Sequence, residues 1–218
     1  MTAIARIAAL DLRSTTPYRR QALVTCCLVV LVLAGKPVAL VPALTVLVVP
    51  VVAAYPFLVA DKADLETLYA VLPVTRRTVL YGHYAWAMAI FLATTAVSTV
   101  LALVLAQARA VPIGGRDLVT VLALSWALFA VNVAIQFPLY IRFGYTRTSM
   151  LSTSLPIVLV VMAIQRLHLT FTPTPGWIAL LGLAGVVAFV ASLAVAMVAD
   201  RRRVRHSRFI ADIPTGRA

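Results

Sequence analysis

Charged residues divide the chain into six long stretches that contain none of them. A helix needs about 20 apolar residues to cross a hydrocarbon layer about 30 Å thick. The pattern therefore predicts an all-α integral membrane protein with six transmembrane helices. The spans cover roughly residues 21–35, 38–60, 83–107, 118–140, 149–165 and 176–199.

The first span is short, with 15 residues between Arg20 and Lys36. These two long side chains can extend its reach by placing their charges at the membrane interfaces. The alternative is a cleaved secretory signal, because Val32-Leu33-Ala34 resembles a small-residue cleavage site. The next apolar stretch follows almost at once, which favours a span.

Composition agrees with a membrane protein. The chain is 62% hydrophobic and 12% charged, whereas soluble domains are about half apolar and about a quarter charged. Mean hydropathy is +1.00. These values exclude a soluble globular enzyme, a disordered tail and a disulfide scaffold. The adjacent Cys26 and Cys27 would point about 100° apart on a helix, so we interpret them as buried thiols.

Lys and Arg are distributed unevenly between alternate loops. Fifteen of them lie in the N-terminus, the second and fourth loops and the C-terminal tail, and four in the other loops. Because cytoplasmic loops carry the excess of Lys and Arg, we expect both termini to be cytoplasmic, in the cell membrane. The charge cluster at 201–208 is then a stop-transfer anchor in a basic tail, 200–218, and we expect no nucleic-acid partner.

Two segments outside the spans have helical patterns. Residues 1–17 include a weakly amphipathic stretch, which we expect to form a helix along the cytoplasmic interface. The second loop holds a stronger pattern, in which Leu65, Leu68, Tyr69 and Leu72 make one apolar stripe.

Acidic residues begin this second-loop helix. Asp61 is placed to cap its start, with Asp64 in the position of a capping-box acid and Glu66 nearby. Pro73 ends it, and Thr75 is a candidate cap for the next helix. Anionic lipid would repel the acidic face, so we expect a protein partner to dock here.

Residues that would carry chemistry are missing. Gly35-Lys36-Pro37 lacks the rest of a phosphate-binding loop. The three histidines are far apart, and His83 is expected at the membrane interface. We also found no Asp, Glu or His inside a span to serve a proton relay. The sequence therefore predicts no enzyme, catalytic residue, metal site or cofactor, and an external energy source for any transport.

Polar residues within the spans are few and mild. Asn132 and Gln136 lie one turn apart and either line a pathway or make interhelical hydrogen bonds, the second being favoured. The last span carries a possible packing face of small residues, namely Ala184, Ala188, Ser192 and Ala196.

Two motifs resemble those of the short ABC-2-type permeases. The first is an acidic helix followed by LPVTR at 72–76 and GHY at 82–84, with His83 where the family commonly has lysine. The second is FPLYIRFGY at 137–145, after the fourth span. Within this second motif, Gly144 lies between two aromatic residues, Phe143 and Tyr145, which indicates a tight turn.

The resemblance implies half of an ATP-driven exporter. A second permease, identical or paralogous, would complete it, and a separate cytoplasmic ATPase would bind ATP and Mg. Hydrophobic or amphipathic cargo such as a peptide, an antibiotic or a lipid is expected. The segment 61–77 would be the coupling helix, which contacts the ATPase. Its docking residues would be Asp61, Asp64, Leu65, Glu66, Leu68, Tyr69, Leu72, Pro73, Arg76 and Arg77.

Two other functions remain compatible with the same pattern. One is a membrane anchor or sensor that recruits a cytoplasmic protein without transporting anything. The other is a stand-alone secondary carrier, which the lack of an intramembrane acid disfavours.

Impermeant thiol reagents test the predicted orientation. In a background lacking Cys26 and Cys27, Gly115→Cys and Thr172→Cys should react from outside intact cells, and Thr215→Cys should react only after permeabilisation. The reason is the excess of positive charge on the side that holds residue 215. The reverse labelling would show that the orientation is inverted.

Overall fold

The computed structural model describes residues 37–62, 75–148 and 174–211, together with the single residues 23, 24, 27, 30, 31, 150, 154 and 158. This part of the chain is helical apart from short connections, and it contains no strand. Its long helices are α3 (Pro37–Lys62), α5 (Arg76–Ala108), α6 (Gly115–Phe143) and α8 (Pro175–Ala211).

All four long helices include a segment with the length and hydropathy of a membrane span. They coincide with four of the predicted spans, 38–60, 83–107, 118–140 and 176–199. The other two predicted spans, the predicted interfacial helix at 1–17 and residues 63–74 of the predicted coupling helix at 61–77 lie outside the described residues, apart from isolated positions in the two spans. Cys27 is one of these positions, and its free thiol is exposed rather than buried as we expected.

Two boundaries differ from the prediction, and a third agrees with it. Asp61 belongs to the last turn of α3, which continues to Lys62, so it does not cap a helix that starts there. The basic tail was placed from residue 200 onward, but α8 continues through it to Ala211. Helical hydrogen bonds do not depend on side-chain polarity, so α8 extends past its apolar segment. The predicted start of the third helix is confirmed, because the Thr75 hydroxyl accepts a hydrogen bond from the Thr78 N–H at 3.3 Å.

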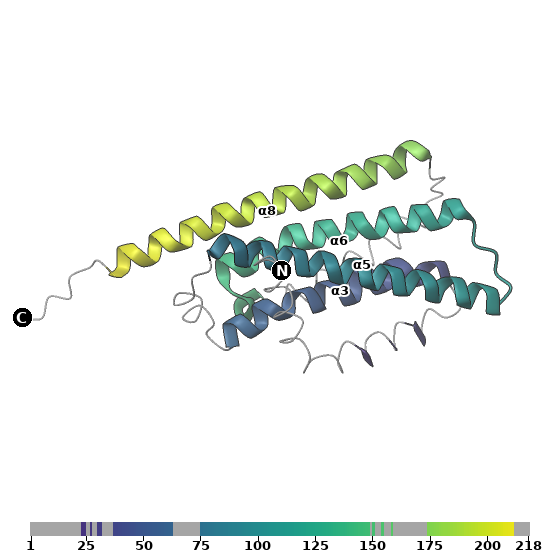
Figure 1. Cartoon of the computed structure of the whole chain (residues 1–218), viewed down its shortest axis with the longest axis horizontal. Coiled ribbons are helices and arrows are strands. Elements are labelled where there is room, and N and C mark those ends of the chain that lie inside the picture. The colour runs from purple at the N-terminus through teal and green to yellow at the C-terminus, as the bar shows by residue number, and fades with distance from the viewer. Residues whose placement is uncertain are drawn as a thin grey trace, which may run out of the picture.

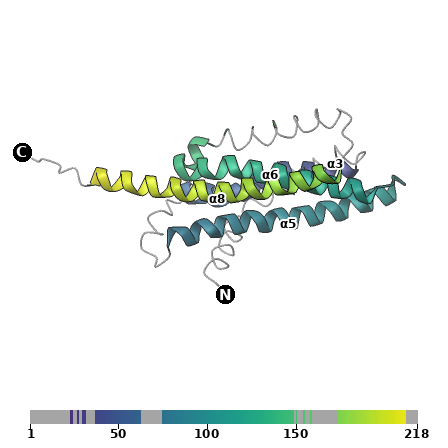
Figure 2. The same ribbon diagram turned by 90° about the horizontal axis from the view of Figure 1, so that it is seen from above.

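Three of the four helices form a row, and the fourth packs on one face of it. α8, α6 and α3 lie side by side, and α5 lies over one face of this row (Figures 1 and 2). Side chains of α3 are mostly buried, whereas few of those along the apolar segments of α5 and α8 are. α3 and α6 therefore form the interior of the described bundle.

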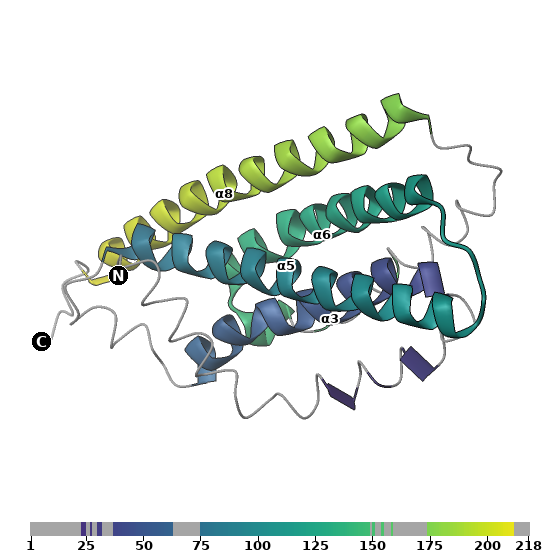
Figure 3. The same cartoon turned by 45° about the vertical axis from the view of Figure 1, so that its right-hand side comes forward.

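α6 and α8 run beside each other and make the most extensive contact in the bundle (Figure 3). Glycine permits this close approach. The indole N–H of Trp126 donates to the Gly182 carbonyl at 3.1 Å, and Gly185 is buried against the same indole. The predicted small-residue face is confirmed in part, because Ser192 and Ala196 are buried while Ala184 is exposed.

Aromatic side chains fill the space between α5 and α6. Phe91 stacks on Phe129 with ring centroids 4.5 Å apart, and Tyr84 meets Phe137 edge to face at 5.0 Å. Phe57 of α3 lies 5.0 Å from the same Phe137 ring. Lipid tails are as apolar as these side chains, so close packing rather than exclusion from water holds the helices together.

Gly185→Ala should destabilise the α6–α8 contact. An added Cβ would lie 2.4 Å from Nε1 of Trp126, and this rigid indole is held by its hydrogen bond to Gly182. Overpacking of this kind costs about 1–3 kcal/mol, which should lower the unfolding midpoint in SDS titrations of the micellar protein.

Gly182→Ala is the matched control. A Cβ at this position meets nothing within 4 Å, so the variant should be as stable as the parent or slightly more so, since alanine favours helix. Equal stability of the two variants would contradict the packing explanation.

Candidate functional site

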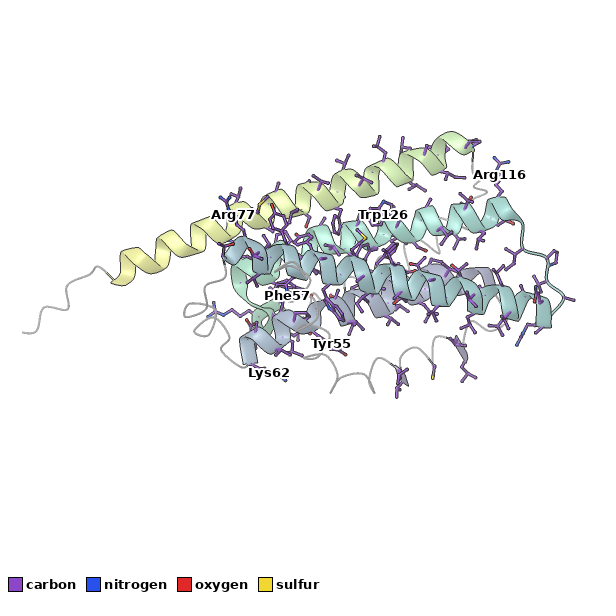
Figure 4. The ribbon with its side chains drawn as sticks, in the orientation of Figure 1. Tyr55, Phe57, Lys62, Arg77, Arg116 and Trp126 are labelled. Carbon is purple, nitrogen blue, oxygen red and sulfur yellow. The ribbon has the colours of Figure 1, made fainter. Side chains whose placement is uncertain are left out.

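One end of the bundle gathers the helix termini that flank the predicted docking segment. α3 ends there, α5 begins there and α6 ends there. Lys62 and Arg77 lie at this end, whereas Arg116 lies at the opposite one (Figure 4). Arg142 stands in the last turn of α6, so the described loops alternate between the two ends as the sequence predicts.

The predicted docking residues fall in two groups. Asp61 ends α3, and Arg76 and Arg77 begin α5, with Arg77 exposed. The remaining docking residues lie outside the described residues, namely Asp64, Leu65, Glu66, Leu68, Tyr69, Leu72 and Pro73.

Asp61 makes a contact that the sequence did not predict. Its Oδ2 atom accepts a hydrogen bond from the backbone N–H of Thr146 at 3.0 Å and another from the Thr146 hydroxyl at 3.2 Å. Thr146 follows the end of α6. The carboxylate thus connects the end of one span to the chain just beyond another.

Gly144 makes this contact possible and confirms the predicted tight turn. Its φ of 81° lies in the region that favours glycine. A Cβ there would also lie 3.1 Å from Oδ2 of Asp61. Residues 145–148 are helical again, so Gly144 separates two helical segments.

The interior contains two polar amide side chains on α6. Asn132 and Gln136 are both buried, at 0% and 1% exposure. Neither the nitrogen nor the oxygen of the Asn132 amide has a hydrogen-bond partner among the described residues. Burying an amide without a hydrogen bond in an apolar interior costs free energy. No contact of the described residues offsets this cost at Asn132.

A second polar group joins three helices. The Ser192 hydroxyl of α8 donates to the Val133 carbonyl of α6 at 3.3 Å. It also lies 2.6 Å from the Tyr84 hydroxyl of α5. Because the Ser192 proton is used on the carbonyl, Tyr84 must be the donor in the second bond.

His83 occupies a different place from the one expected. It is buried at 6% exposure rather than lying at the interface, and its ring centroid is 4.8 Å from that of Phe57. It is also an ionisable side chain inside a described span, so the expectation that the spans lack one was wrong. Aromatic surroundings account for its burial. Within the described part, no three His, Cys, Asp or Glu side chains are grouped as metal ligands.

Comparison with protein families decides what kind of membrane protein this is. The model of the ABC-2 family transporter proteins matches residues 11–199, which is most of the chain. This chain belongs to the ABC-2 transporter family. Searches of curated proteins and of solved structures gave no match.

As an ABC-2 permease, the chain is a multi-pass transport subunit of the membrane and is not itself catalytic. The resemblance seen at the LPVTR and FPLYIRFGY motifs is thereby confirmed. The permease's polar contacts between helices were not predicted, because each joins residues far apart in the sequence. One feature of the sequence points to the Asp61 contact. A helical segment that starts after Gly144 has no capping side chain of its own, so it needs an acceptor from elsewhere in the chain.

Removing the Tyr84 hydroxyl should loosen the three-helix junction of the permease. Tyr84→Phe keeps the ring contacts with Phe137 and Phe189 and removes the bond to Ser192. Interhelical hydrogen bonds in membranes contribute about 0.6 kcal/mol and at most about 2 kcal/mol. The free energy of unfolding measured in SDS titrations should therefore fall by an amount of this size.

Tyr81→Phe provides the comparison. The Tyr81 hydroxyl contacts only a weak acceptor in the described part, the sulfur of Met197 at 3.7 Å, and its loss should leave stability unchanged. If Tyr84→Phe is no less stable than Tyr81→Phe, the junction does not contribute to helix association.

Proposed function

We propose that the chain is the membrane subunit of an ABC exporter, driven by ATP that a separate cytoplasmic subunit hydrolyses with Mg. The observation that carries the proposal is the family match over residues 11–199 on a chain whose described helices are long and apolar. Asp61 and Asp117 lie within three residues of helix ends, so the described spans hold no acid deep in the membrane that would indicate a proton relay.

The ATPase is proposed to dock on the segment between α3 and α5. Both flanking helix ends lie at one end of the bundle (Figure 4), so the segment leaves the bundle and returns to it on the same side. Its sequence combines an apolar stripe with an acidic face, as described above. Thr75 starts α5 with a cap of its own, so the start of α5 does not depend on this segment for its cap.

The same end is proposed to face the cytoplasm, in the cell membrane. Lys62, Arg77, Arg142 and Arg147 belong to this end, whereas Arg109 and Arg116 flank the short connection between α5 and α6 at the other. The positive-inside tendency supports this orientation.

A second permease subunit, identical or paralogous, and a hydrophobic or amphipathic cargo complete the proposal. α5 and α8 expose long apolar faces that include Leu92, Val97, Leu183 and Val187, and these suit lipid or a second subunit. Asn132 and Gln136 are proposed to line the cargo pathway. The unpaired amide of Asn132 supports this role, because a polar group from cargo or water could pair with it when the helices separate.

Docking is tested by shortening two apolar side chains of the segment. A docked helix relies on a few buried anchors worth about 2 kcal/mol or more each. Leu68→Ala with Tyr69→Ala should therefore weaken ATPase association about 100-fold or more, since each 1.4 kcal/mol is tenfold. The measurement is co-purification of the ATPase with the variant in mild detergent, at matched expression.

The control removes the same two types of side chain from the exposed face of α5. Tyr81→Ala with Leu92→Ala changes residues within a span and should leave association unchanged. Charge reversal at Glu66 should cost less than the double variant and depend on salt. Retention of the ATPase at parental levels by the Leu68/Tyr69 variant would show that this segment is not the docking element.

A further inference from the structure

The helical segment that begins at Tyr145 lacks a cap of its own. Gly144 precedes it and accepts a hydrogen bond from the Thr148 hydroxyl at 2.8 Å through its carbonyl. A residue in this position normally supplies a side-chain oxygen to the N–H two or three residues later. Glycine has no side chain, so the N–H of Thr146 needs an acceptor from another part of the chain.

Asp61 supplies that acceptor from 85 residues away in the sequence. Its Oδ2 atom receives both the N–H and the hydroxyl of Thr146. The space for the carboxylate exists because Gly144 has no Cβ, which would lie 3.1 Å from Oδ2 and 3.7 Å from the carboxylate carbon. A negative group is also favourable at the positive end of a helix.

Asp61 lies next to the segment that is proposed to dock the ATPase, so its contact with Thr146 connects the end of that segment to the chain beyond α6. Only Lys62 separates it from the segment proposed to dock the ATPase. A displacement of that segment moves the end of α3, and the carboxylate moves with it. The other flank of the segment is different, because the cap of α5 comes from Thr75, which is local to α5 itself.

We propose that Asp61 is a positioning residue that transmits movement of the docking segment to the helical segment starting at Tyr145. It acts by holding the N–H of Thr146, so the end of α3 and the chain beyond α6 move as one body. Gly144 serves as the joint, since its positive φ separates this segment from α6. The inference rests on the proposed function, which supplies the force.

The first experiment examines the cap in the purified permease, without an ATPase. Amide hydrogen exchange is measured for the peptide containing Thr146. Asp61→Ala should speed exchange of its protected amides about five-fold, as expected for loss of a helix cap. Asp61→Asn keeps an acceptor oxygen and should restore most of the protection.

Asp117→Ala is the matched control for this experiment. Asp117 is also an exposed carboxylate at a helix start, but it lies in the first turn of its own helix, α6. Its removal should leave exchange at Thr146 unchanged. If Asp61→Ala leaves it unchanged as well, the cap does not hold the segment and the proposal is wrong.

The second experiment examines transmission in the complex with the ATPase. Spin labels replace the exposed residues Lys62 and Arg147, and their distance is measured without nucleotide and after trapping with ATP and vanadate. In the parent the distance should be the same in both states, because the two sites move together. In Asp61→Ala it should differ between the states, and Asp61→Asn should again resemble the parent.

The outcomes separate the two proposals. A parental distance that changes on trapping, or an Asp61→Ala distance that does not, would overturn the transmission role although the ATPase binds. If no ATPase associates with the parent chain, the proposed function fails and transmission fails with it, while hydrogen exchange still decides whether Asp61 is the cap.

Discussion

The structure depends on the absence of water inside the bilayer. Backbone N–H and C=O groups must then be paired within the chain, and a helix pairs them within one segment. The same condition removes the usual force that brings helices together, because apolar side chains gain little by leaving lipid for protein. Close packing, aromatic contacts and a few hydrogen bonds must therefore hold the bundle. Each of these is visible between α6 and its neighbours.

α6 is the helix on which these contacts converge. Gly185 of α8 leaves room for the Trp126 indole, which reaches a backbone carbonyl, and aromatic side chains bridge the wider gap to α5. Ser192 adds a polar connection to both α5 and α6. A transporter must separate helices during its cycle, and contacts worth a kcal/mol or so each can be broken individually. The buried Asn132 amide lies among these contacts without a hydrogen-bond partner in the described part of the chain.

The end of the bundle that holds Asp61 is organised differently. There the chain is close to water and relies on specific polar contacts, with Thr75 capping α5 and Asp61 reaching Thr146. Both contacts flank the segment proposed to meet the ATPase. A subunit without catalytic residues can contribute to an ATP-driven process only by moving, so the connections at this end determine which helices follow the ATPase.

The sequence by itself determined the class of the protein, four of its spans as far as they are described, the start of α5 at Thr75 and the turn at Gly144. Each follows from local properties, namely an unbroken apolar stretch, a hydroxyl at a helix start or a residue without a side chain. Only the tertiary structure decided that Asp61 ends α3 and caps a distant segment, that His83 is buried against Phe57, and that Gly185 rather than Ala184 faces Trp126. Apolar residues surround most of these helices, so the sequence pattern does not show which face of a helix meets another and which meets lipid. That choice depends on shape and on single hydrogen bonds between residues far apart in the chain, which exist only once the helices have assembled.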